Sequence, residues 1–180
     1  MTAFTLEEET ENRLDWRILR DGSICLYRNH QFLEDDLSWL GSNGYRIVSI
    51  DCANWSSSDL MHDSLKLSLS FPSYYGRNLD ALEECMSEDL EVPEIGGLVL
   101  VLEHFDRYSN GAGAEIMRSG RSEAEVVLDI FACASRRFLL TGRRLMTLAQ
   151  SDDPRIHFER LGGASTQWNT REWLNKNRGL

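Results

Sequence analysis

Cysteine and long apolar runs are scarce in this chain of 180 residues, and each scarcity excludes a class of protein. The four cysteines, Cys25, Cys52, Cys85 and Cys133, lie far apart and form no CxxC pair. They predict reduced, buried thiols rather than a disulfide framework or a zinc site. No apolar run approaches the length of a membrane span, and no charged-then-apolar leader opens the chain. We therefore expect a cytoplasmic protein that makes no contact with a membrane.

The motifs of the common enzyme classes are also missing. The histidines His30, His62, His104 and His157 form neither an HExxH nor an HxH arrangement, and no GxSxG, Walker or Rossmann glycine pattern occurs. Cys85 lies among carboxylates, which disfavour the thiolate that a nucleophile needs. We expect no enzymatic activity and no cofactor, although an enzyme that uses the carboxylates remains a weaker alternative.

Positive charge is scarce in one stretch in particular. The formal net charge is −10, and Arg77 is the single base among nine acids between Pro72 and Asp106. The sign reverses between Arg136 and Arg178, where nine bases meet four acids. An acidic surface disfavours nucleic acid and steers a basic protein toward it. The sequence thus predicts a basic protein partner and no direct contact with nucleic acid.

An acidic helix lies at the centre of this stretch. Pro72 and Gly76 mark the turn before it, and Asn78 is placed to cap its N-terminus. Its apolar residues recur at three- and four-residue intervals and predict one buried stripe: Leu79, Leu82, Met86 and Leu90.

The other face of this helix carries Asp80, Glu84 and Glu88 at four-residue spacing, with Glu83 and Asp89 beside them. Like charges at that spacing destabilise a helix by roughly a few tenths of a kcal/mol each, so the pattern invites a role in binding. Two alternatives stay open: solvated acids near the positive end of the helix dipole, and a site for a hard cation. The acids lack the glycine-hinged spacing of an EF-hand loop, so we expect no metal.

Strands predicted at about 45–51, 98–103 and 144–149 alternate with helices, which is typical of a parallel α/β sheet. Helices are expected to begin near Ser57 and at Ser122. Residues 16–19 and 24–27 flank Asp21-Gly22 and predict an N-terminal β-hairpin, which a helix over 32–40 follows. We expect one domain over 1–180, divided into a frayed tail (1–12), an N-terminal extension (13–44), a core (45–150) and a C-terminal appendage (151–180).

Three ordered blocks of this sequence resemble the barstar family, small intracellular proteins that inhibit barnase-type ribonucleases. The first block contains Tyr74-Tyr75-Gly76, Asn78-Leu79-Asp80-Ala81-Leu82 and Cys85, preceded by Pro72. The second is the apolar run 98–103 followed by Phe105, and the third is 127–131. The resemblance covers about Tyr45 to Gln150, and it implies a small three-stranded parallel core.

The resemblance also implies a function. In this family the acidic helix and the loop before it block the active site of a ribonuclease, whose cations the carboxylates pair with. Carried to this sequence, that implies a basic ribonuclease or nuclease toxin as partner. The expected contact residues are Tyr74, Gly76, Asn78, Leu79, Asp80, Glu83, Glu84, Ser87 and Glu88.

This chain differs from the family at positions that would determine which partner it binds. Glu84 stands where the family has its most important aspartate, and Glu83 and Asp89 stand where the best-known member has tryptophans. Cys133 stands at or near the position where the best-known member has a glutamate in its last helix. These changes favour a different target. The alternative is an acidic interaction module of the same fold with a regulatory partner that is not a nuclease.

Overall fold

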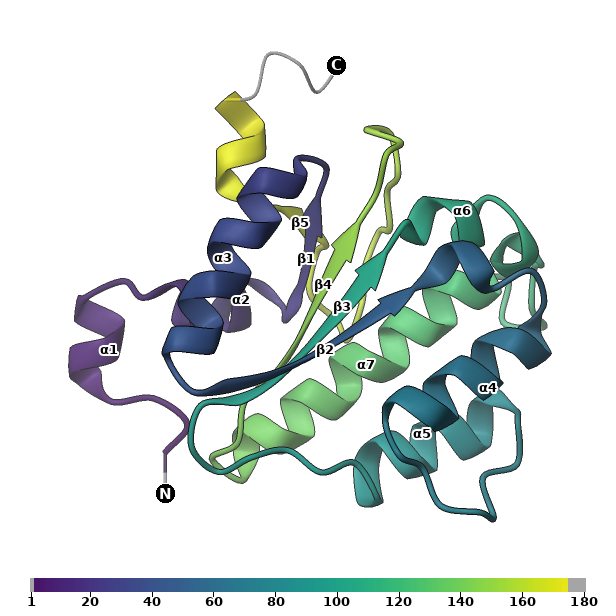
Figure 1. Ribbon diagram of the computed structural model, residues 1–180, viewed down its shortest axis with the longest axis horizontal. Helices are drawn as coiled ribbons and strands as arrows, with labels where there is room; N and C mark the ends of the chain where they lie inside the picture. Colours follow the sequence, from purple (N-terminus) through teal and green to yellow (C-terminus); the bar gives the residue numbers. More distant parts are fainter. Residues whose placement is uncertain (1, 175–180) are drawn as a thin grey trace.

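The computed structural model describes residues 2–174 and is built around a five-stranded parallel sheet (Figure 1). Its spatial order is β2-β3-β4-β1-β5, and every neighbouring pair is parallel. The strands are β1 (Ile24–Tyr27), β2 (Tyr45–Asp51), β3 (Gly97–Glu103), β4 (Leu145–Gln150) and β5 (Gln167–Trp168). The parallel α/β class is confirmed, as are the three core strands and a strand at 24–27, and β5 adds a strand that was not predicted.

Strand β3 shows why helices must cover both faces of this sheet. Leu98, Leu100 and Leu102 pack into the hydrophobic core on one face, whereas Val99 and Val101 pack into the core on the other. All five side chains are completely buried. A parallel strand buried on both faces is apolar at every position, which is why this run could be recognised in the sequence.

Helices form a layer on each face of the sheet (Figure 1). One layer holds α4 (Ser58–Ser68), α5 (Leu79–Glu88) and α7 (Glu123–Leu140), and the other holds α2 (Leu14–Asp21) and α3 (His30–Ser42). The shorter elements are α1 (Leu6–Thr10), α6 (Phe105–Ser109) and the 3-10 turns η1 (Cys52–Asn54), η2 (Ala112–Ala114) and η3 (Thr170–Leu174). Two predicted helix starts are confirmed, with Ser57 and Ser122 as N-caps.

The predicted N-terminal hairpin is wrong. Residues 16–19 belong to α2, and β1 instead lies parallel to β4, with Ile24 opposite Thr147. The Asp-Gly pair ends a helix here: Gly22 has a φ of 129°, and its N–H donates to the carbonyl of Ile18. A Cβ on Gly22 would lie 2.7 Å from the Cβ of Ala164, so glycine suits this position for two reasons.

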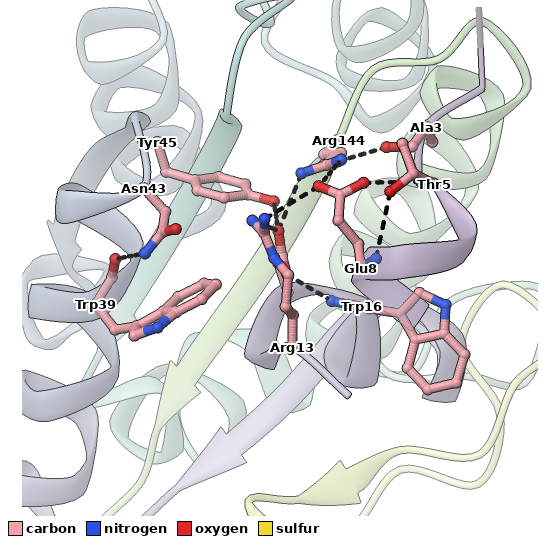
Figure 2. Close-up of polar contacts among 10 residues, drawn as sticks. Ala3, Thr5, Glu8, Arg13, Trp16, Trp39, Asn43, Tyr45 and Arg144 are labelled. Carbon is pink, nitrogen blue, oxygen red and sulfur yellow. Dashed lines mark hydrogen bonds and ion pairs between the residues drawn. The ribbon is translucent and has the colours of Figure 1, made fainter. Parts of the chain in front are cut away.

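The segment before α2 is held down by buried charge, in contrast to the frayed tail expected over 1–12. Asp15 is completely buried, and it accepts hydrogen bonds from Arg13 at 2.9 Å, from Arg144 at 3.0 Å and from the Tyr45 hydroxyl at 2.7 Å (Figure 2). Arg144 also donates to Glu8 in α1 at 2.8 Å and to the Ala3 carbonyl at 2.7 Å. These contacts tie α1 to the N-terminal end of β4.

Three of the four cysteines meet the expectation of burial, and one does not. Cys25, Cys52 and Cys85 are buried, whereas Cys133 is exposed on α7. A position on the outer face of α7 explains the difference, since its neighbours Ala132 and Ala134 point inward.

No helix within residues 2–174 is both long and apolar enough to cross a bilayer.

Candidate protein-binding site

The acidic helix α5 belongs to the same helical layer as α4 and α7 and packs against α7 (Figure 1). Its apolar stripe is as predicted, because Leu82, Cys85 and Met86 are buried and Leu79 packs partly against the same core. The predicted cap is also confirmed: the Asn78 side chain accepts a hydrogen bond from the Ala81 N–H at 2.8 Å. Both the start and the orientation of α5 are therefore fixed by local sequence.

The loop before α5, residues 71–78, is fixed from below by aromatic side chains. Phe71 and Tyr75 are buried, and their rings lie 5.1 Å apart. The Tyr75 hydroxyl is hydrogen-bonded to Nδ1 of the buried His62 on α4. Burial raises the pKa of Tyr75 and lowers the pKa of His62, so both groups are neutral at pH 7. The loop thus packs on a buried cluster of uncharged aromatic side chains.

Polar contacts fix the outer side of the same loop. Arg77, which has a φ of 48°, forms an ion pair of 2.7 Å with Asp63 of α4. Lys66 donates to the Ser73 carbonyl at 3.2 Å, and Asn78 donates to the Gly76 carbonyl at 3.1 Å. A Cβ on Gly76 would lie 3.2 Å from the Asn78 side-chain nitrogen, which leaves little room for another residue. These contacts hold the loop against α4 and against the start of α5.

The outer face of α5 carries four exposed carboxylates, Asp80, Glu83, Glu84 and Glu88. Within residues 2–174 no Lys, Arg or His forms an ion pair with Asp80, Glu83 or Glu84, and Glu88 reaches only Arg137, at 4.0 Å. Burial raises the pKa of the Cys85 thiol to about 12, and the carboxylates of Asp89 and Glu84 add to the shift. The face is therefore a concentrated negative charge that the surrounding helices leave uncompensated.

Tyr74 and Asp89 form a contact that the sequence did not indicate. The exposed Tyr74 hydroxyl donates to the Asp89 carboxylate at 2.7 Å and so joins the loop to the C-terminal end of α5. This hydrogen bond raises the pKa of Tyr74 to about 12, because the carboxylate favours the neutral phenol. Only the fold shows that these residues meet, since fifteen positions separate them.

The nine predicted contact residues all lie on this loop and helix. Seven are exposed: Tyr74, Gly76, Asn78, Asp80, Glu83, Glu84 and Glu88. Leu79 and Ser87 are half-buried, and Leu79 packs against the core. Cys133 of α7 adjoins this face, since the Glu83 carboxylate is among the charges that raise its pKa, after burial and Asp129. Within residues 2–174 no three His, Cys, Asp or Glu side chains converge closely enough to hold a metal ion.

The fold is that of a parallel α/β protein with an acidic helix on its surface, and comparison with known families makes the class specific. The chain belongs to the barstar family, because the family model described as Barstar (barnase inhibitor) matches residues 45–150, more than half of the chain. The match begins at β2 and ends at β4. It therefore includes the loop, α5 and α7, and it leaves β1 and β5 outside.

Two individual proteins are similar to this chain. "Putative ribonuclease inhibitor YrdF" of Bacillus subtilis (strain 168) is 43% identical over 65 residues, which are 36% of this chain and 66% of that protein. The aligned part of this chain thus spans just under two thirds of the relative. A chain from "Structure of Drosophila ORC bound to AT-rich DNA and Cdc6" is 19% identical with a TM-score of 0.49, and the match covers 97% of this chain and 60% of that one. A structural likeness of that size carries no argument about fold or function.

Proposed function

We propose that this protein is an inhibitor that binds a basic ribonuclease or nuclease toxin through the 73–78 loop and the outer face of α5, and blocks its active site. Family membership and the relative's name support a ribonuclease-inhibitor role. The observation that carries the proposal is the set of exposed carboxylates at Asp80, Glu83 and Glu84, for which no cation within residues 2–174 forms an ion pair.

The chemistry of inhibition follows from charge. A ribonuclease binds the RNA phosphates with cationic side chains, and carboxylates at similar spacing compete for the same cations. Because the loop and the helix are fixed before binding, little conformational entropy is lost when the complex forms. Truncating one partner of a buried charge pair at such an interface costs about 2–5 kcal/mol, much of it because the other charge is left buried and unpaired.

The target is proposed to differ from that of the best-known family member. Glu84 is one methylene longer than the aspartate that it replaces, and Glu83 and Asp89 replace aromatic residues with charge. Tyr74 is the exposed aromatic residue of this face, and tyrosine is enriched among residues that dominate binding energy. We propose that Tyr74 supplies the apolar contact that the family elsewhere takes from α5.

The same surface is poorly suited to catalysis. With a pKa of about 12, Cys85 carries a protonated thiol at neutral pH, and the buried His62 is already bonded to Tyr75. We therefore propose a non-enzymatic role without a cofactor. All four cysteines are free thiols, which fits our proposal that the protein acts in the reducing cytoplasm.

Capture of partners followed by a nuclease assay tests the proposal. Wild type, Asp80→Ala/Glu84→Ala and the control Glu115→Ala/Glu159→Ala are immobilised, and the activity of captured ribonuclease is measured. The control removes two exposed charges away from α5, so it matches the change in net charge. We expect inhibited ribonuclease on wild type and control and none on the α5 variant. A captured ribonuclease that stays fully active would contradict the proposal.

The departures at Glu83 and Asp89 favour one other function, an acidic interaction module with a regulatory partner that is not a nuclease. The same experiment separates the two. A basic partner that lacks nuclease activity, is lost with the Asp80→Ala/Glu84→Ala variant and is kept by the control identifies the module.

A further inference from the structure

A cavity of about 280 Å³ lies between α2, β1 and the segment that runs from β5 into η3. All of its lining residues belong to 14–25 or 167–173, so both terminal extensions build it and the family match over 45–150 contributes none. It borders the helical layer that contains α2, whereas α5 lies in the opposite layer (Figure 1). The cavity is thus a separate feature from the acidic face.

The walls of this cavity are mainly apolar and aromatic. Leu14, Ile18 and Ile24 contribute aliphatic surface, and Trp168 and Trp173 contribute indole rings. Trp173 is 67% exposed although it is one of the largest apolar side chains in the molecule. Indole rings bind aromatic ligands by stacking or edge-to-face contact. Polar and charged residues complete the lining: Arg17, Arg20, Asp21, Gln167, Asn169 and Thr170. Apolar walls that carry such polar groups are the usual form of a small-molecule site.

One cation in the cavity, Arg17, forms no ion pair with any residue that the structure describes. Arg17 of α2 lines the cavity, and its Nε is buried without a hydrogen-bond partner within residues 2–174. The other two charged groups neutralise each other, because Arg20 donates to both carboxylate oxygens of Asp21 at 2.7 and 2.8 Å. Because the Arg17 guanidinium lines the cavity and forms no ion pair within residues 2–174, a ligand carboxylate in the cavity could pair with its charge.

Arg17 also lines a larger cavity of about 610 Å³ on its other side, but that one suits an anion less well. Arg13 is paired there with Glu8 and Asp15, and Asp35 and Asp36 are paired with Arg171. Glu11 also borders this cavity and would repel an anion beside Arg17. An anion that pairs with Arg17 therefore has a favourable electrostatic environment in the smaller cavity alone.

We propose that the smaller cavity binds a small aromatic carboxylate, whose ring contacts Trp168 and Trp173 and whose carboxylate pairs with Arg17. The two terminal extensions then add a ligand site to the family core. This inference is independent of the proposed function, since no residue of the cavity belongs to the loop or to α5.

The test compares naphthalene-2-carboxylate with its neutral isostere naphthalene-2-carboxamide. Binding to the full chain is followed by calorimetry and by the indole N–H resonances of Trp168 and Trp173. We expect the carboxylate to bind about tenfold or more tightly than the amide, because a charged hydrogen bond replaces a neutral one. Arg17→Gln should abolish this preference, whereas Arg118→Gln, which removes an exposed charge elsewhere, should preserve it.

Two further variants guard against a general loss of folding. Arg17→Lys keeps the charge and should retain part of the preference for the carboxylate. Trp173→Ala removes an exposed ring and should weaken both probes by a similar factor. Failure of both probes to bind wild type, equal affinity for the two, or a preference that survives in Arg17→Gln would overturn the proposal.

Discussion

Two acidic regions of this molecule differ in burial and in pairing: Glu8 and Asp15 near the N-terminus are paired with arginines, whereas Asp80, Glu83 and Glu84 on α5 form no ion pair within residues 2–174. Asp15 is completely buried and accepts hydrogen bonds from two arginines and a tyrosine. Asp80 and Glu84 are exposed, and no ion pair within residues 2–174 includes them. Paired acids stabilise the fold, whereas acids that repel one another on a helix slightly destabilise it and are available to a partner.

The largest expected effect is on the paired region. Arg144→Ala should lower the free energy of unfolding by about 3–5 kcal/mol, because it leaves the buried Asp15 with Arg13 as its one cation and removes the contacts of Arg144 with Glu8 and Ala3. Urea unfolding measures this change. The matched control is Arg137→Ala, which removes only a 4.0 Å contact with Glu88 and should leave stability within about 0.5 kcal/mol. Equal effects for the two variants would contradict the comparison.

The next effect concerns binding alone. Asp80→Ala/Glu84→Ala should weaken affinity for the inhibited ribonuclease by at least about 2 kcal/mol, roughly thirtyfold, because the partner's cations lose their carboxylates. The unfolding midpoint should change little, because relief of like-charge repulsion on α5 offsets the loss of Asp80 from the positive end of the helix dipole. Calorimetric titration and urea unfolding on the same samples measure both. A large loss of stability together with the loss of affinity would make these acids structural, like Asp15.

A smaller effect is expected at the contact between the loop and the end of α5. Asp89→Asn should lower the pKa of Tyr74 from about 12 toward 10, because the carboxylate that stabilises the neutral phenol is gone. A raised pKa in the folded state contributes stability that is fully present below pH 10 and is lost as the pH rises through 12. Ultraviolet titration of tyrosinate detects the shift, with Tyr74→Phe identifying the signal. An unchanged titration in Asp89→Asn means that the contact does not form.

The smallest effect is a local one at acid pH. Hydrogen bonds and the charge of Arg144 lower the pKa of Glu8 despite the opposing effect of partial burial. A lowered pKa contributes stability that is present above the ordinary value of 4.5 and is lost as the pH falls through the lowered value. Amide exchange in α1 should therefore accelerate, relative to its intrinsic rate, as the pH falls below 4.5 and through the lowered pKa of Glu8, before the core unfolds. Exchange in α1 that follows the core at every pH would show that Glu8 does not hold the segment.

Much of the central fold could be predicted because its signals are local. The continuous apolar run of β3 indicates a strand buried on both faces, and Asn78 and Ser122 lie where helix caps are expected. The prediction of an N-terminal hairpin was wrong because an Asp-Gly pair such as Asp21-Gly22 is equally compatible with a turn and with the end of a helix. Leu14 and Ile18, at helical spacing, were the signal that could have decided between them. Strand β5 has two residues and is defined only by its pairing with β1, which no local pattern shows.

The surface of the candidate site could be predicted from the sequence, but the contacts that hold its loop in place could not. The apolar stripe and the acidic face of α5 follow from residue spacing, and both are present. The contacts that hold the loop, such as Tyr75 with His62 and Arg77 with Asp63, join separate elements and appear only in the fold. The same holds for Arg144, which lies far along the chain from the Asp15 that it neutralises.

The most direct test of the central claim is the residual activity of the captured ribonuclease at one equivalent of this protein. With wild type and with Glu115→Ala/Glu159→Ala, we predict that activity falls close to zero. With Asp80→Ala/Glu84→Ala at the same concentration, we predict that most of the activity returns. Full inhibition by the α5 variant would contradict the claim that these unpaired carboxylates form the inhibitory site.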